Sequence, residues 1–304
     1  MVLKTTKIYL MKLILVAIAL IIGISSGFSQ ENPENSETTK PKDSPILIRD
    51  SFEDIILINN QTSKVLRKNT LQLEIQHRFG RIDQGFQVGN NFDLFGIFGS
   101  SNIRVGANFG LSDRIMIGIG GTKNNNLYNL QWKYNIFRQT ESMGMPVSVT
   151  YYGNTSVNIS ANSDFVTVSK RLSYFHQILI SRKFSNKLSL QIAPSIAHFN
   201  IIDTIRYQDI SHNNFSFCFS GRYKFAAQTS FIFEYTQPLT ISESVGTKPD
   251  LGIGVEIATR SHAFQLFVGT ANAIINQYNM AYNALDFTKG EIQLGFNIIR
   301  RWNF

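Results

Sequence analysis

The sequence predicts an all-β fold, an antiparallel transmembrane β-barrel of about twelve strands, within a range of about ten to fourteen. Apolar and polar residues alternate in segment after segment from residue 70 onward, and the connections between these segments are short and long in turn. The chain also ends on an aromatic residue, Phe304, in phase with the apolar face of the last segment. After residue 30 no uninterrupted apolar run reaches the ~20 residues of a membrane-spanning helix, so strands would have to cross the membrane.

The first 29 residues have the order of a secretory signal peptide. Lys4, Lys7 and Lys12 precede an apolar stretch over residues 13–23, and small residues follow. The stretch is too short to anchor the chain in a membrane, so we expect cleavage after Ser29. Export through this peptide predicts a location in the bacterial outer membrane.

Residues 30–68 are predicted to form a flexible periplasmic leader. The stretch ENPENSETTKPKDSP is rich in Glu, Ser, Thr, Lys and Pro, and it has too few apolar residues to offset the entropy lost on ordering. An apolar island, FEDIILI at 52–58, interrupts this composition. Three interpretations of the island stay open: a short helix, a plug inside the barrel, or an additional strand.

The barrel is predicted over residues 69–304. In its first segment, Leu71, Leu73 and Ile75 alternate with polar residues, which gives a strand with one apolar and one polar face. The twelve segments with this pattern are, in order, 70–79, 102–110, 114–121, 127–137, 146–153, 172–184, 188–199, 215–225, 229–236, 250–258, 262–270 and 290–301.

The connections between these segments differ in length in a regular way. The long ones are 80–101, 154–171, 200–214, 237–249 and 271–289, with a shorter member at 122–126. The short ones are 111–113, 185–187, 226–228 and 259–261, with a longer member at 138–145. Short periplasmic turns and long extracellular loops are typical of outer-membrane barrels, whereas a secreted β-sandwich would not explain the asymmetry.

The last predicted strand points to two partners. Trp302, Ile298 and Phe296 share the face of Phe304, and only Arg300 interrupts it. Such a face would contact outer-membrane lipids, with the arginine reaching the interface. A terminal aromatic in this position resembles the signal read by the bacterial barrel-assembly machinery, so we expect that machinery to bind the strand ending at Phe304.

Several segments together resemble an uncharacterised family of β-barrel outer-membrane proteins from Bacteroidota. The likeness runs from about residue 55 to the end of the chain and implies an outer-membrane β-barrel, in agreement with the porin-like fold expected from the strand pattern. The family has no established activity, so the resemblance supplies no functional residues. The segments that carry it are LEIQHRFG (73–80), NIRVGANFGLSDRIMIGIG (102–120), MPVSVT (145–150), ISRKFSNKLSLQIAPS (180–195), GRYKF (221–225) and GFNIIR (295–300).

Residues typical of catalysis or metal binding do not form a recognisable motif, so the sequence predicts no enzyme, no cofactor and no metal site. Cys218 is the only cysteine, which excludes an intrachain disulfide and a cysteine-based zinc site. His198 and His212 flank a predicted loop with Asp203 and Asp209, but we expect solvated side chains there. The histidines, none in a catalytic motif, are His77, His176, His198, His212 and His262.

The net charge of +8 raises the question of an anionic partner. The Lys and Arg residues form no cluster on a nucleic-acid-binding module, so nucleic acid is not expected as a partner. On the polar face of the strands we instead assign five basic and three acidic residues to the lumen. These candidates are Glu74, Arg78, Arg104, Lys133, Arg222, Lys224, Glu234 and Glu256.

Two functions for the lumen stay open. The charges could neutralise one another in a closed, plugged barrel, or they could line a narrow pore with a mild preference for anions. The leading hypothesis is a non-enzymatic channel or small-solute-binding barrel. The alternative is a closed structural or surface-interaction barrel that acts through outer loops such as 85–100. A membrane-embedded hydrolase is least expected, because no nucleophile can be paired with a base.

Overall fold

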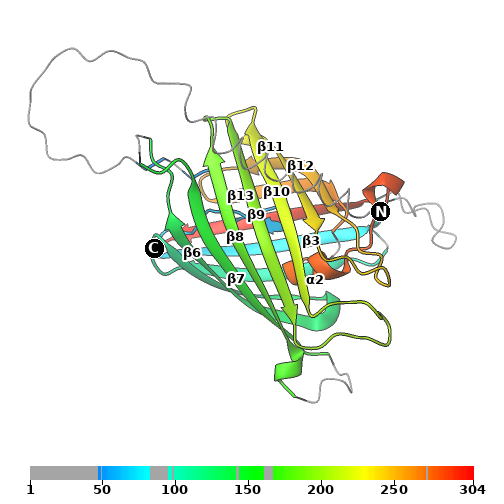
Figure 1. Cartoon of the computed structure of the whole chain (residues 1–304). Helices are drawn as coiled ribbons and strands as arrows, with labels where there is room; N and C mark the ends of the chain where they lie inside the picture. The colour runs from blue at the N-terminus through cyan, green and yellow to red at the C-terminus, as the bar shows by residue number, and fades with distance from the viewer. Residues whose placement is uncertain are drawn as a thin grey trace, which may run out of the picture.

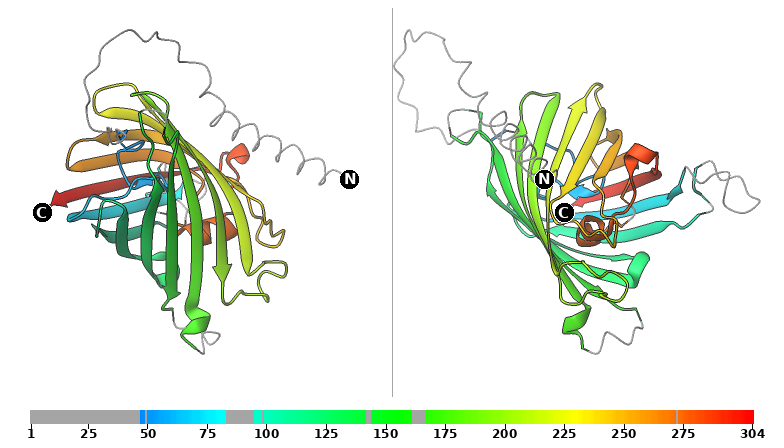
Figure 2. Two further views of the ribbon diagram at one scale, coloured as in Figure 1. Left: turned by 60° about the vertical axis from the view of Figure 1, so that its left-hand side comes forward. Right: turned by 45° about the vertical axis from the view of Figure 1, so that its right-hand side comes forward.

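Twelve strands close into one antiparallel barrel in the computed structural model (Figures 1 and 2). The structure describes residues 47–48, 50–82, 95–97, 99–141, 144–160, 167–271 and 273–304. Each barrel strand pairs with its neighbours in sequence, and β14 returns to pair with β3, which closes the sheet. No helix among the described residues is long and apolar enough to cross a membrane.

All twelve predicted strands are present, with ends displaced by a few residues. The largest difference is at β7, which continues to Asn158 because its polar end completes the ladders with β6 and β8. The barrel strands are β3 (Thr70–Arg81), β4 (Asn102–Gly110), β5 (Ile115–Thr122), β6 (Leu127–Phe137), β7 (Ser148–Asn158), β8 (Leu172–Lys183), β9 (Leu188–Phe199), β10 (Asn213–Lys224), β11 (Thr229–Pro238), β12 (Asp250–Ala258), β13 (His262–Gly269) and β14 (Gln293–Asn303).

The barrel wall has an apolar outer face and a largely polar inner face, as the alternation predicted. In β3 the side chains of Leu73 and Ile75 are exposed on the outside, whereas Gln72, Glu74 and Gln76 are buried inside. An apolar belt on a closed sheet suits a lipid environment, because closure leaves no unpaired strand edge. Further outward apolar residues are Val105, Ile117, Ile119, Leu130, Phe215, Phe231, Ile253, Val255, Phe264, Leu266 and Val268.

The two rims of the barrel differ as expected. One rim, the short-turn rim, carries the connections 111–114, 138–147, 184–187, 225–228 and 259–261 and the C-terminal end of β14. The other, the long-loop rim, carries the remaining connections, including 159–171, 200–212, 239–249 and 270–292. Most of the predicted outer loop 85–100 lies outside the described residues, as do residues 1–46.

In the described parts of the long connections lie three short 3-10 helices and one α-helix. The 3-10 helices are η2 (Asn124–Asn126), η3 (Ser169–Arg171) and η4 (Phe287–Lys289). The helix α2 (Asn276–Tyr282) folds back from the long-loop rim and packs against the inner face of β8, β9, β10 and β11. Its Met280 and Ala281 join a buried cluster with wall residues such as Phe175.

Residues 51–66, the luminal hairpin, lie inside the barrel (Figure 2). The strands β1 (Ile56–Leu57) and β2 (Asn60–Gln61) pair with each other and not with the barrel. The chain approaches at the short-turn rim, where Leu47 bridges Thr140, and it returns there to begin β3. A flexible leader over 30–68 therefore does not describe residues 51–66, and their position matches the plug that was one of three interpretations of 52–58, because their apolar side chains contact inward-facing apolar residues of the wall.

Candidate functional site

The tip of the luminal hairpin is held between two oppositely charged wall residues. Arg78 donates from Nε and Nη2 to Asn59 Oδ1, at 3.0 and 2.8 Å, and from Nη2 to the carbonyl oxygen of Ile58 at 3.0 Å. On the other side, Glu234 accepts from the backbone N–H groups of Asn59 and Asn60 at 3.1 Å and from Asn59 Nδ2 at 2.8 Å. The Asn59 amide therefore bridges a guanidinium and a carboxylate.

A buried lysine holds the base of the hairpin. Lys133 has no exposed surface, and its Nζ donates to the carbonyl oxygens of Ile55 at 2.6 Å, Thr62 at 2.8 Å and Lys64 at 3.3 Å. An ammonium group has three donors, so all of them are used by the hairpin backbone. Three backbone carbonyl groups of the hairpin thus replace the water molecules that would hydrate the Lys133 ammonium group.

Neutral wall residues complete the hydrogen bonds of the hairpin backbone. Gln265 accepts from Ile58 N at 3.2 Å and donates to Ile56 O at 3.0 Å. Gln191 accepts from Ser63 N at 2.8 Å and donates to Gln61 O at 2.8 Å. Because buried peptide groups are costly when unpaired, these side chains make a polar lumen compatible with an enclosed chain segment.

The wall also offers apolar patches that match the hairpin. Leu57 and Ile58 pack with Ile232 and Phe267, Ile55 packs with Met116, and Ile56 packs with Ala263 and Ile299. These wall residues occupy inward positions where a water-filled pore would carry polar groups. The inner surface is therefore shaped for this segment in both polarity and volume.

Four of the other predicted lumen charges pair with neighbours of opposite charge. Glu74 and Arg104 form a buried salt bridge, and Arg104 also donates to Asn129. Arg222 is 2.8 Å from Glu256 and 3.5 Å from Glu53 of the approach to the hairpin. Lys224 is half-buried at the short-turn rim. Seven of the eight candidates are thus buried inside the barrel, in contact with the hairpin or with one another.

Two glycines make room for these contacts. A Cβ on Gly252 would lie 2.9 Å from Ile58 of the hairpin, and a Cβ on Gly120 would lie 2.4 Å from the Arg104 guanidinium. Real Cβ atoms do not approach other groups this closely, so a side chain at either position would displace its neighbour.

Above the hairpin, helix α2 forms a floor that three amide side chains fix in place. Asn276 donates to Asn59 O of the hairpin tip at 3.1 Å, Gln277 donates to Ser156 of β7 at 2.8 Å, and Asn279 donates to Asp250 of β12 at 3.1 Å. The hairpin from one rim and the helix from the other therefore meet inside the barrel.

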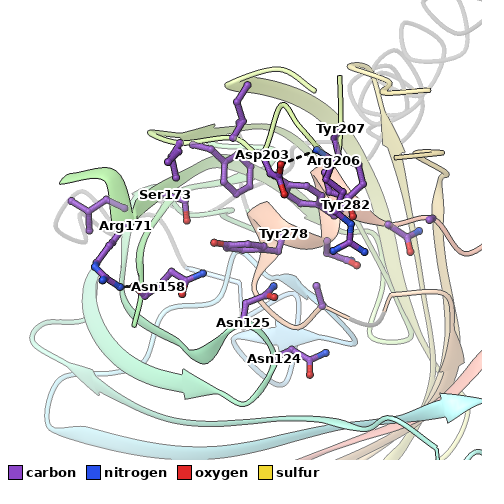
Figure 3. A pocket seen from close by; sticks show the side chains of 18 of the residues that line it. Asn124, Asn125, Asn158, Arg171, Ser173, Asp203, Arg206, Tyr207, Tyr278 and Tyr282 are labelled. Atoms are coloured by element: carbon purple, nitrogen blue, oxygen red, sulfur yellow. Dashed lines mark hydrogen bonds between the residues drawn. The ribbon is translucent and has the colours of Figure 1, made fainter. Parts of the chain in front are cut away.

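A cavity of about 540 Å³, the vestibule, lies over α2 at the long-loop rim (Figure 3). Tyr278 and Tyr282, one helical turn apart, present their rings to it, and Phe199 contacts both rings edge-on. Its other lining residues include Asn124, Asn125, Asn158, Lys170, Arg171, Ser173, Asp203, Arg206, Tyr207 and Asn283.

The sequence analysis did not select any of these vestibule residues. Most of them lie in long connections that show no alternation, so strand periodicity could not assign them to a face, and Asn158, Ser173 and Phe199 lie at the long-loop ends of β7, β8 and β9. The one signal available was the spacing of Tyr278 and Tyr282, which places both rings on one side of a helical turn. Burial raises the pKa of both phenols above the usual range, so both stay neutral at physiological pH.

The histidines of the long-loop rim have protein partners. His198 Nδ1 lies 2.8 Å from Asn213 Oδ1, and His212 Nδ1 lies 2.5 Å from the carbonyl oxygen of Phe199. Asp209 is bound by Ser242 and Ser244 of the neighbouring loop. Within the described part of the chain, no group of three or more His, Cys, Asp or Glu side chains is arranged to hold a metal ion.

A closed twelve-stranded barrel with an apolar belt and a filled polar interior defines a membrane β-barrel protein. The chain belongs to the family described as "Membrane bound beta barrel domain (DUF5777)", whose model matches residues 52–302. This match begins at Phe52, so the luminal hairpin is part of the family domain and not an appendage to it.

Solved structures of similar fold are outer-membrane barrels with little sequence similarity. The NanC porin is 11% identical over 77% of this chain and 100% of its own, with a TM-score of 0.47. The KdgM porin is 8% identical over 77% of this chain and 99% of its own, with a TM-score of 0.43. An outer-membrane channel from Pseudomonas putida F1 is 9% identical over 79% of this chain and 98% of its own, with a TM-score of 0.45. These likenesses concern the fold alone, and no curated protein sequence matches the chain.

Proposed function

We propose that the chain is a porin-like, non-enzymatic barrel of the bacterial outer membrane in which a small solute enters at the long-loop rim and the luminal hairpin gates its passage. Two features support this location, with the short-turn rim in the periplasm: the signal-peptide pattern at the start of the sequence, and the different lengths of the connections at the two rims. Lipids would then surround the apolar belt, and the assembly machinery would bind β14, whose Phe304 is 80% exposed.

The observation that carries the proposal is the independence of the hairpin from the wall. The hairpin strands pair only with each other, whereas all twelve barrel strands are paired without them. Leaving the lumen would therefore break side-chain contacts but no rung of the barrel sheet. An element whose removal leaves the surrounding fold intact is suited to opening and closing a passage.

A non-enzymatic role is supported by the lining of the vestibule. Hydrolytic catalysis by a serine needs a base within hydrogen-bonding reach. Ser173 lines the vestibule, but no histidine is among the lining residues that the structure describes. Burial raises the pKa of Tyr278 and Tyr282, so these two phenols keep their protons at neutral pH and cannot replace an imidazole as a base.

Single-channel conductance of the detergent-purified protein in a planar bilayer tests the gate. We expect the full mature chain to be silent or nearly so, and a variant lacking residues 30–66 to give discrete conductance steps. A variant lacking only residues 30–46 is the matched control, because it keeps the hairpin and should behave as the full chain. A folded barrel migrates faster on a gel before heating than after heating, so this shift verifies that each variant was folded.

One structural feature favours a second function, that of a permanently closed barrel acting through its outer loops. The hairpin buries Phe52, Ile55, Ile56, Leu57 and Ile58 almost completely, as a structural core would. Under this alternative the folded variant without residues 30–66 would collapse onto α2 and stay silent. Deletion of loop 85–100 would then abolish capture of a surface partner, and that result together with a silent barrel would overturn the gate.

A further inference from the structure

We propose that the vestibule binds a small anionic, polyhydroxylated solute of the sugar-acid class. The inference rests on the proposed function, because it names the solute that would enter the barrel. It stands on three properties of the cavity: an aromatic platform, amide side chains opposite that platform, and an excess of positive charge.

The platform consists of ring faces held rigidly by their neighbours. Tyr278 and Tyr282 stack with ring centroids 5.9 Å apart, and Tyr207 contacts Tyr282 at 5.7 Å. Phe199 supports both from the wall at 5.2 and 5.6 Å. Ring faces of this kind pack against the C–H side of a pyranose, and their rigidity lowers the entropic cost of binding.

Polar groups surround the rim of this platform. Asn125 and Asn158 lie on the side of the cavity that Tyr278 faces (Figure 3), and Asn124 and Asn283 also line it. A side-chain amide offers both donors and an acceptor, and so does each hydroxyl of a sugar. The hydroxyls of Tyr278 and Ser173 add further groups of the same kind. A polyhydroxylated solute exchanges hydrogen bonds with groups of this kind, whereas a purely apolar solute offers none.

The charge of the vestibule selects an acidic solute. Among the lining residues that the structure describes, three are cations, Lys170, Arg171 and Arg206, and one is a carboxylate, Asp203. Arg171 is oriented by bonds to the carbonyl oxygens of Asn158 at 3.0 Å and Ser160 at 2.9 Å, and Arg206 stacks over the Tyr207 ring at 5.2 Å. Cations placed beside an aromatic platform match a carboxylate at the edge of a ring.

The buried wall cations cannot provide this selectivity in the closed barrel. Arg78 and Lys133 are occupied by the hairpin, and Arg104 and Arg222 by carboxylates. The positive charge that an incoming solute meets is therefore that of the vestibule, above the closure.

Isothermal titration of the full mature protein in detergent tests the proposal with glucuronate and glucose, which differ at C6 alone. We expect glucuronate to bind at least 10-fold more tightly than glucose. We also expect the double variant Lys170→Gln, Arg206→Gln to lose at least 10-fold for glucuronate and to leave glucose unchanged. Lys187→Gln, on the opposite rim, is the matched charge control and should bind as the parent does.

Other outcomes would overturn the inference. Equal binding of glucose and glucuronate, or an unchanged affinity in the double variant, would remove the role of the charge. If acetate competed as well as glucuronate, the sugar ring would not contribute to binding. An unchanged affinity of Tyr282→Leu for glucuronate would lead to the same conclusion. No binding of either sugar by a folded barrel would reject the solute class. None of these measurements requires passage, so they fail or succeed independently of the conductance experiment.

Discussion

Asn59, at the tip of the luminal hairpin, shows how a single side chain can report whether the lumen is closed. Its oxygen accepts from Arg78 and its nitrogen donates to Glu234, so the orientation of the amide is fixed by two opposite charges. Both oxygens of Glu234 accept from N–H groups of the hairpin. Because hydrogen bonds to a charged group are stronger than neutral ones, this carboxylate should dominate the docking of the tip.

We expect Glu234→Gln to favour release of the hairpin. The new amide nitrogen would oppose backbone donors of Asn59 or Asn60, at a cost of about 1–3 kcal/mol, which corresponds to roughly 5- to 150-fold in the docked population. The rate of maleimide labelling of a Gln61→Cys reporter in a Cys218→Ala background measures this release. Glu243→Gln, at an exposed position of the connection 239–249, serves as the matched control. Equal labelling rates in the two variants would contradict the prediction.

Among the larger elements, the loop 200–212 is tied to the loop 239–249 by one carboxylate. Asp209 accepts from Ser242 Oγ at 2.7 Å, from Glu243 N at 2.6 Å, and from both the backbone and the hydroxyl of Ser244. The hydroxyls of Ser244 and Ser242 hold the pKa of Asp209 well below its usual range. The tie positions the segment that carries Arg206 and Tyr207 of the vestibule.

The sign of the pKa shift determines the pH dependence of this tie. A carboxyl group whose pKa is lower in the folded state stabilises that state above the ordinary aspartate value of about 4, and the effect declines as the pH falls through the lowered pKa. Hydrogen exchange at the amides of Glu243 and Ser244, corrected for intrinsic rates, should show constant protection from pH 8 to 5. Asp209→Asn should lose protection at pH 7, whereas Asp113→Asn at the opposite rim should not. Equal protection in both variants would exclude the tie.

Sequence periodicity detects the barrel strands but not the luminal hairpin. Alternation located every barrel strand because each has one face in an apolar and one in a polar environment. The hairpin has no such alternation: Ile55 to Ile58 are all buried, since side chains on every side of an enclosed segment meet the wall. Its polar flanks suggested disorder, and the partners that order it, such as Lys133 and Glu234, lie far away in sequence.

For the whole molecule, the closed barrel could be predicted from one sequence, but the state of its lumen could not. Inward placement of Arg78, Arg104 and Glu234 follows from parity alone. Their pairing depends on which residues face them across the barrel, and that is a property of the closed sheet. The vestibule is lined by residues of several connections that lie far apart in the sequence, so their positions could not be inferred from a local pattern.

Removal of the hairpin should leave the barrel folded but less resistant to heat. The variant lacking residues 30–66 keeps all twelve strands but loses an element that stabilises only the folded barrel, as a bound ligand would. We expect the temperature of the heat-induced gel shift to fall by ~10 °C, in keeping with a loss of a few kcal/mol from a domain of this size. An unchanged temperature would show that the hairpin contributes nothing to the stability of the wall.

The hydrogen bond from Asn276 to Asn59 has a thermodynamic consequence. It joins the floor of the vestibule to the tip of the hairpin, so the two compartments of the lumen share one boundary. If a ligand in the vestibule changes the free energy of hairpin docking, the docked hairpin must change the free energy of ligand binding by the same amount. Removal of the hairpin would then change the affinity for the ligand. Linkage of this kind would let the long-loop rim register, by equilibrium alone, what happens to a segment held from the short-turn rim.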